Sequence, residues 1–105
     1  MTKVVEIITE EEYTRFINEN KRVIIFYGAT NCSACDNIKT LYGKISNKYF
    51  KRISFGYTDV EKAHLGIKYV PLLVSFYKGT EFKRKVGADG EALREFIKDV
   101  IVSNK

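Results

Sequence analysis

The sequence is poor in the residues that mark several special classes of protein. Its 105 residues include one proline, seven glycines, two cysteines and no tryptophan. So little proline and glycine argues against a linker-rich or low-complexity chain, and two cysteines cannot form the disulfide framework of a small secreted domain. No stretch approaches the roughly 20 uninterrupted apolar residues that a membrane-spanning helix requires. The apolar start of the chain is broken at Glu6 and does not resemble a secretory signal, so we expect a cytoplasmic protein with no membrane partner.

The residues that are present can build one hydrophobic core. Apolar residues make up 45% of the chain and include seven tyrosines and seven phenylalanines, which argues against disorder. The length suits one compact unit, so we expect a single domain over residues 1–105. Eighteen basic residues against 13 acidic ones give a net charge of +5, which favours solubility and a weak attraction for anions.

Apolar spacing along the chain predicts alternating strands and helices. Apolar runs of strand length lie at residues 4–8, 23–27, 53–57, 72–77 and 82–86. Segments with helical spacing lie at residues 10–20, 33–49, 61–65 and 92–101. Strands and helices alternate at first, and a hairpin and a helix then close the chain. The fold class is therefore α/β: one sheet of about five strands, covered on both faces by about four helices.

Local signals support individual elements of this pattern. Thr9 and Glu12 have the spacing of a capping box at the start of a helix. The continuous apolar run at residues 23–27 is typical of a central strand that is covered on both faces. Gly66 is placed to end the short helix before it, and residues 78–80 form a tight turn typical of a hairpin.

The two cysteines form the motif Cys32-Ser33-Ala34-Cys35, between a predicted buried strand and a long helix. At the first turn of a helix, unpaired backbone N–H groups and the helix dipole favour negative charge. A thiolate at Cys32 is stabilised there, so its pKa should fall below the value of about 8.5 for a free cysteine. A thiolate is the species that attacks a disulfide. Cys35 lies one turn further along, where it is better shielded and close enough to resolve a mixed disulfide.

Three other roles for the cysteine pair remain open at this point. The pair could be a structural disulfide that staples one helical turn. It could form half of a zinc site, although zinc prefers four ligands and only His64 is available as another soft partner. Two chains could also share an iron–sulfur cluster through four thiolates.

Three segments carry a resemblance to a known family: "FYGATNCSAC", "KYVPLLVSFYKGT" and "KVGADGEALREFI". Together they resemble the thioredoxin superfamily over nearly the whole chain. The resemblance implies a thioredoxin fold and a dithiol–disulfide oxidoreductase that acts on protein disulfides, without a cofactor or metal. It also implies that Cys32 attacks and Cys35 resolves, with a disulfide reductase as the electron donor. We expect a monomer.

The resemblance also assigns the surroundings of the dithiol. The family proline at the position of Pro71 follows a cis peptide bond and packs against the dithiol, whereas composition alone would make it an ordinary residue at the start of a strand. The backbone of Val70 would pair with an extended substrate segment. Gly87 and Ala88 would form the other wall of that groove. Asn31 would line it, and Ser33 and Ala34 would help to set the stability of the thiolate.

The chain departs from the family pattern at three places near the dithiol. Asn31 stands where a tryptophan is usual, and Ser33-Ala34 replaces the usual Gly-Pro. A buried aspartate beneath the dithiol is also usual, but the matching stretch at residues 23–26 is entirely apolar. We therefore expect slower exchange, and we favour reduction because nothing indicates export. A binding module that kept the fold but lost catalysis is the alternative function.

The remaining polar and aromatic residues have plainer interpretations. The basic hairpin residues Lys78, Lys83, Arg84 and Lys85 predict a solvated edge that discourages strand pairing, and no base-stacking motif indicates a nucleic-acid partner. We expect Asp36 to point to solvent and His64 to have no catalytic role. The tyrosines at positions 42, 49, 57, 69 and 77 are expected to be packing residues.

Overall fold

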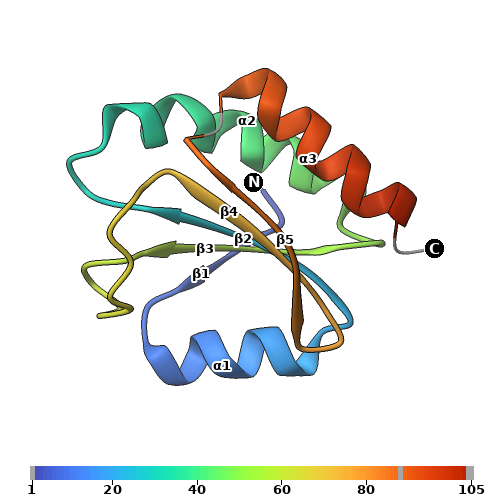
Figure 1. Ribbon diagram of the computed structural model, residues 1–105, viewed down its shortest axis with the longest axis horizontal. Helices are drawn as coiled ribbons and strands as arrows, with labels where there is room; N and C mark the ends of the chain where they lie inside the picture. Colours follow the sequence, from blue (N-terminus) through green and yellow to red (C-terminus); the bar gives the residue numbers. More distant parts are fainter. Residues whose placement is uncertain (1, 88, 104–105) are drawn as a thin grey trace.

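The computed structural model describes residues 2–87 and 89–103, which form a mixed β-sheet with helices on both faces (Figure 1). The strands are β1 (Val4–Ile7), β2 (Arg22–Gly28), β3 (Ser54–Asp59), β4 (Leu72–Tyr77) and β5 (Thr80–Val86). The helices are α1 (Glu10–Glu19), α2 (Ser33–Tyr49) and α3 (Gly90–Ser103). The strand order is β1-β3-β2-β4-β5, with β1, β3 and β2 parallel and with β4 and β5 antiparallel to their neighbours. The predicted five-stranded sheet is confirmed.

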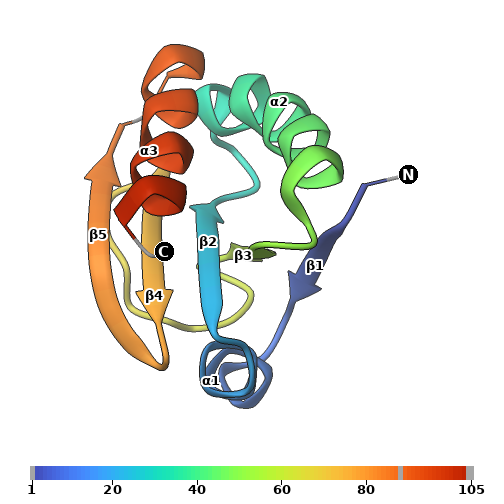
Figure 2. The same ribbon diagram turned by 90° about the vertical axis from the view of Figure 1, so that its right-hand side faces the viewer.

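The helices cover the two faces of the sheet unequally. Helix α1 lies on one face, and α2 and α3 lie together on the other (Figures 1 and 2). The central strand β2 serves both faces, because successive side chains of a strand point in opposite directions. Ile24 and Phe26 belong to the core cluster of the α2 and α3 face, and Ile25 and Tyr27 belong to the cluster of the α1 face. This double burial explains why residues 23–27 are continuously apolar.

Helix α2 is fixed to the sheet by a buried tyrosine. The side chain of Tyr42 is fully buried, and its hydroxyl is directed at two backbone carbonyls, that of Ile24 at 3.0 Å and that of Gly56 at 2.7 Å. Burial raises the pKa of the Tyr42 phenol well above its ordinary value, so the group remains a neutral donor. The Tyr42 ring also meets the rings of Phe26 and Phe55 edge to face. These contacts fix the helix that carries both cysteines.

The predicted capping box at the start of α1 is confirmed. The Thr9 hydroxyl accepts a hydrogen bond from the backbone N–H of Glu12 at 3.1 Å, and the Glu12 carboxylate accepts one from the backbone N–H of Thr9 at 3.1 Å. Two backbone donors that have no partner within the helix are thereby satisfied.

We expect Thr9→Ala to lower the free energy of unfolding by about 1 kcal/mol, because it leaves the Glu12 N–H without its capping acceptor. Urea titration followed by circular dichroism would measure the change. Thr14→Ala is the matched control, since Thr14 is exposed in the middle of the same helix and caps nothing. Equal midpoints for Thr9→Ala and the native chain would contradict the assignment.

The prediction of a fourth helix at residues 61–65 is wrong. The segment makes turns, in which the N–H of Ala63 bonds to the carbonyl of Asp59 and the N–H of Leu65 bonds to the carbonyl of Val60. The Asp59 carboxylate accepts from the backbone N–H groups of Glu61 and Lys62, as at the start of a helix. His64 then adopts a φ of 54°, in the left-handed region, which ends the helical path after one turn.

The basic hairpin is solvated, as predicted. Strand β5 lies at the edge of the sheet, and most of its residues are exposed. Lys83 forms an ion pair with Asp99 of α3, and Arg84 forms one with Glu81 of its own strand. His64 and Asp36 are exposed, as expected. Among the described residues, no helix combines the length and the apolar character needed to cross a lipid bilayer.

Candidate active site

The sheet register brings three separate segments to one end of the molecule. Tyr27 of β2 pairs with Leu72 of β4, and Leu72 pairs with Val86 of β5. Three segments therefore meet at the same end of the strands, beside the first turn of α2 (Figure 1). They are the segment that follows β2, the segment that precedes β4, and Gly87 after β5. The backbone N–H of Gly87 donates to the carbonyl of Pro71 at 2.8 Å and joins two of these segments.

Cys32 occupies the N-cap position of α2. Its backbone is extended, with φ −115° and ψ 99°, and its Sγ accepts a hydrogen bond from the backbone N–H of Cys35 at 3.1 Å. The same sulfur is joined to Sγ of Cys35 in a disulfide. A backbone amide at the positive end of the helix dipole therefore points at the first sulfur. Such an arrangement favours a sulfur anion once the disulfide is reduced.

The two sulfurs differ in their access to solvent. Cys32 is half-buried at the surface, whereas Cys35 is only 2% exposed and belongs to the core cluster on the α2 and α3 face. A large substrate can therefore reach Cys32 more easily than Cys35. This asymmetry matches the predicted order of an outer attacking thiol and an inner resolving thiol.

The segment before β4 contributes the proline that was predicted to lie at the site. The Val70–Pro71 peptide bond is cis, as the resemblance implies, and Pro71 is buried. Val70 is half-buried and packs against the same core cluster as Cys32. The register of β2 and β4 places Val70 and Pro71 at the same end of the sheet as the loop that leads to the dithiol.

The other predicted site residues lie around this end. Asn31, Ser33 and Ala34 are exposed on either side of Cys32. Gly87 is exposed and has a φ of +69°, a conformation that glycine adopts without steric cost. Ala88 lies outside the described residues. Of the predicted site residues that the structure describes, Asn31, Ser33, Ala34 and Gly87 are exposed, and Cys35 and Pro71 are buried.

The apolar stretch beneath the dithiol is confirmed. Residues 23–26 are fully buried in β2. The buried polar side chains among the described residues are those of Ser46, Thr58 and Ser75, and none of these is acidic. The position at which the family usually has a buried carboxylate is thus filled by aliphatic and aromatic side chains.

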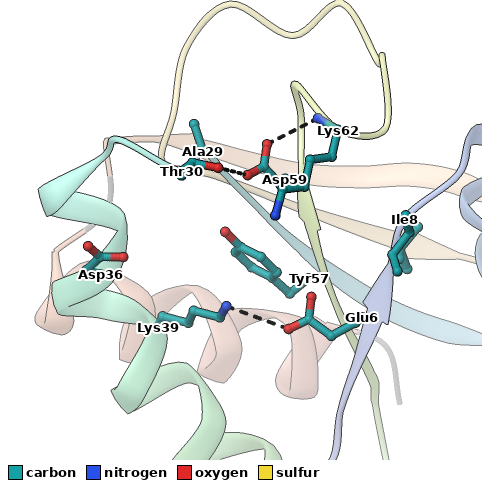
Figure 3. A pocket seen from close by; sticks show the side chains of 10 residues that line it. Glu6, Ile8, Ala29, Thr30, Asp36, Lys39, Tyr57, Asp59 and Lys62 are labelled. Atoms are coloured by element: carbon teal, nitrogen blue, oxygen red, sulfur yellow. Dashed lines mark hydrogen bonds and ion pairs between the residues drawn. The ribbon is translucent and has the colours of Figure 1, made fainter.

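A cavity of about 330 Å³ lies beside the dithiol segment (Figure 3). It is lined by residues of both charges: Lys39 lies 3.6 Å from Glu6, and Thr30 donates a hydrogen bond to Asp59 at 2.7 Å. The burial of Asp59 opposes its ionisation, yet hydrogen bonds from Thr30 and from two backbone N–H groups hold its pKa below the usual value. The charged residues of the lining are three carboxylates, Glu6, Asp36 and Asp59, and two lysines, Lys39 and Lys62.

Tyr57 forms the inner wall of this cavity and lies against the loop that leads to Cys32. Its ring packs edge to face on Phe26, with ring centroids 5.3 Å apart, and the Lys39 ammonium lies 4.0 Å from its centroid. Burial raises the pKa of the Tyr57 phenol, and the nearby carboxylates add to the shift, so the hydroxyl stays neutral. A Cβ atom at Gly28 would lie only 2.7 Å from this hydroxyl. Any larger residue at position 28 would therefore force the Tyr57 side chain to shift.

We expect Gly28→Ala to lower the free energy of unfolding by about 1–3 kcal/mol, because the added methyl group displaces a packed ring. Chemical denaturation of the oxidised protein would measure the loss. The double variant with Tyr57→Phe should recover part of it, since the closest atom is removed while the ring carbons stay near, at 3.0 and 3.2 Å. Equal losses in the single and double variants would assign the strain to the backbone instead.

One residue of this surface was not predicted as a site residue. Tyr69 was expected to be a packing residue, but its side chain is 72% exposed, so that prediction is wrong. Tyr69 lies in the segment just before Val70 and Pro71, outside every strand and helix, so no core periodicity applies to it. An aromatic residue directly before the groove residues was the signal that could have identified it.

Comparisons with known proteins agree with this geometry. The family model described as Thioredoxin matches residues 4–99. The chain is 26% identical over 99 residues to Thioredoxin-3 of Dictyostelium discoideum, covering 90% of this chain and 93% of that protein. It is 29% identical over 101 residues to a thioredoxin of Coprinus comatus, covering 90% and 95%. Among solved structures, thioredoxin of Plasmodium falciparum matches with a TM-score of 0.84 at 24% identity, covering 90% of this chain and 97% of that one.

Proposed function

The chain belongs to the thioredoxin family and is a thiol–disulfide oxidoreductase, and we propose that it reduces protein disulfides through Cys32 and Cys35. The observation that carries this assignment is the hydrogen bond from the Cys35 N–H to the Cys32 sulfur at the start of α2. It supports Cys32 as the thiolate and Cys35 as its partner.

The reaction proceeds by two exchanges of sulfur. The Cys32 thiolate attacks one sulfur of the substrate disulfide, the substrate S–S bond breaks, and the departing substrate thiolate takes up a proton. Cys35 then loses its proton and attacks the Cys32 sulfur, which expels the second substrate sulfur as a thiolate and leaves the disulfide between Cys32 and Cys35. Two electrons pass from the dithiol to the substrate. Because no Asp or Glu is buried among the described residues, the proton of Cys35 passes to water or to another base.

The substrate lies along the surface around Cys32. An extended substrate segment pairs with the backbone of Val70, which gives affinity without requiring one sequence. Pro71 forms the floor of this groove, and Gly87 forms its far wall. Asn31 borders the groove on the side of the dithiol. Ser33 and Ala34, in the first turn of α2, help to set the stability of the Cys32 thiolate. The exposure of Asn31, Ser33, Ala34 and Gly87 supports this placement.

The direction of exchange is reductive, so a disulfide reductase must return two electrons to the oxidised chain after each turnover. We place the protein in the cytoplasm, where such a donor is available, and we expect it to act as a monomer. Equilibration against glutathione and dithiothreitol buffers would test the direction. A reductant should have a potential below about −230 mV, near or beyond that of the cytosolic glutathione pool.

Insulin reduction tests the activity directly. With dithiothreitol as the electron source, the native chain should precipitate the insulin B chain several times faster than dithiothreitol alone. A chain whose thiols have been alkylated with iodoacetamide is the matched control. If the native and alkylated chains gave the same rate, the dithiol would have no catalytic part in protein reduction, and the fold would serve binding instead.

A further inference from the structure

Tyr69 is the most exposed of the large hydrophobic side chains in the described part of the chain. Its side chain is 72% exposed, against 42–59% for the other exposed ones. Within the described residues it makes no hydrogen bond, ion pair or ring contact. Isolated exposed apolar residues are common on protein surfaces, so the position of Tyr69 decides whether its exposure matters.

Tyr69 lies at the end of the molecule that carries the dithiol. It directly precedes Val70, which packs against the same core cluster as Cys32, and the sheet register brings this segment beside the loop after β2. Because Val70 and Pro71 lead straight into β4, the backbone at Tyr69 is held close to the groove. Its ring is therefore available to whatever binds there.

The residues assigned to the groove beside Tyr69 are uncharged, whereas Lys68, which precedes Tyr69 in the chain, is charged and exposed. The three converging segments contribute to this groove Asn31, Cys32, Ser33, Ala34, Val70, Pro71 and Gly87. None of them carries a charge, although 30% of the residues in the chain do. A groove of this kind selects substrates mainly by apolar contact, and tyrosine supplies a large, rigid contact area at low entropic cost.

We propose that Tyr69 determines substrate specificity, favouring protein disulfides whose cysteine is flanked by aromatic or large aliphatic side chains in an extended segment. This inference rests on the proposed function. When a substrate strand pairs with the Val70 backbone, the side chains next to its cysteine come within reach of the residue that precedes Val70. The Tyr69 ring covers one of them and removes apolar surface of both partners from water.

Two synthetic peptides test this specificity. Each is a homodimer joined by one disulfide, and the two differ only in the residues on either side of the cysteine, which are phenylalanine in one and serine in the other. Their reduction by the chain, with dithiothreitol as electron source, is followed by liquid chromatography. The native chain should reduce the phenylalanine peptide with a kcat/KM about tenfold higher, the size of effect that one buried aromatic anchor gives.

Three variants identify the residue responsible. Tyr69→Ala should lower the preference to about twofold, mainly through a higher KM for the phenylalanine peptide, whereas Tyr69→Phe should keep it because the ring remains. Phe82→Ala is the matched control, since it removes an exposed aromatic ring from β5, outside the proposed groove. It should leave the preference at its native value.

The outcomes separate this inference from the proposed function. If the native chain reduces both peptides faster than dithiothreitol alone but without preference, or if Tyr69→Ala keeps the full preference, the specificity role is overturned and the oxidoreductase remains. If neither peptide is reduced faster than by dithiothreitol, the proposed function itself fails.

Discussion

Cys32→Ser should reduce insulin no faster than dithiothreitol alone. A serine hydroxyl is not ionised at neutral pH, so the variant has no anion at the start of α2 to attack a disulfide. Cys35 is still present, but it is only 2% exposed and belongs to the core. It therefore cannot replace the outer thiol towards a protein substrate. Loss of all activity above background is the largest functional effect expected from one substitution in this chain.

The assay needs a control for folding, because the variant also lacks the disulfide between positions 32 and 35. Far-ultraviolet circular dichroism of Cys32→Ser and of the reduced native chain should agree. Ser33→Ala changes the exposed neighbour of Cys32 and keeps both thiols, so it should keep its activity above background. Substantial activity in a folded Cys32→Ser protein would show that Cys35 attacks directly, and the assigned order of the two thiols would be wrong.

Replacement of Cys35 should convert a catalyst into a covalent trap. In Cys35→Ser the outer thiol still attacks a substrate, but no second sulfur is present to release it. The mixed disulfide between Cys32 and the substrate should therefore persist. Non-reducing electrophoresis of the variant mixed with oxidised insulin should show an adduct that dithiothreitol removes, whereas the native chain should show none at steady state. Turnover should fall to background.

The burial of position 35 decides the choice of variants. Serine places a hydroxyl in an apolar cluster, which costs roughly 1–3 kcal/mol when the hydroxyl has no partner. Cys35→Ala avoids that cost and should form the same adduct. The double variant with Cys32→Ser should form none. If an adduct formed in the double variant, it would not involve the dithiol, because both cysteines of the chain are then absent.

Much of the fold could be predicted because the local sequence signals for strands and helices agree with the burial of those elements in the folded chain. Residues 23–27 are apolar without interruption because β2 is covered on both faces, and Thr9 with Glu12 marks the start of α1 by a mechanism that needs only neighbouring residues. The dithiol could be assigned to a helix start for the same reason. Its spacing and the strand before it are both local features.

The features that were missed depend on backbone geometry and packing that apolar spacing does not describe. Residues 61–65 have a helical pattern, but the left-handed backbone of His64 stops the helix after one turn. Gly28 reads as a simple strand breaker, and only the position of Tyr57, on the neighbouring strand β3, shows why a side chain does not fit there. Residue type alone does not distinguish Tyr69 from the tyrosines that pack in the core. It is exposed because it lies outside every strand and helix, where the spacing of apolar residues gives no information about burial.

Ser33 and Ala34 are exposed, while the cysteines on either side of them cap the helix and fill the core. Evolution can therefore change the electrochemistry of this centre separately from its architecture. A surface replacement costs about 0.5 kcal/mol of stability or less, whereas roughly 1.4 kcal/mol of preference between thiolate and disulfide moves a two-electron potential by about 30 mV. The same scaffold can thus be adapted to hosts or compartments of different redox poise by substitution at two positions.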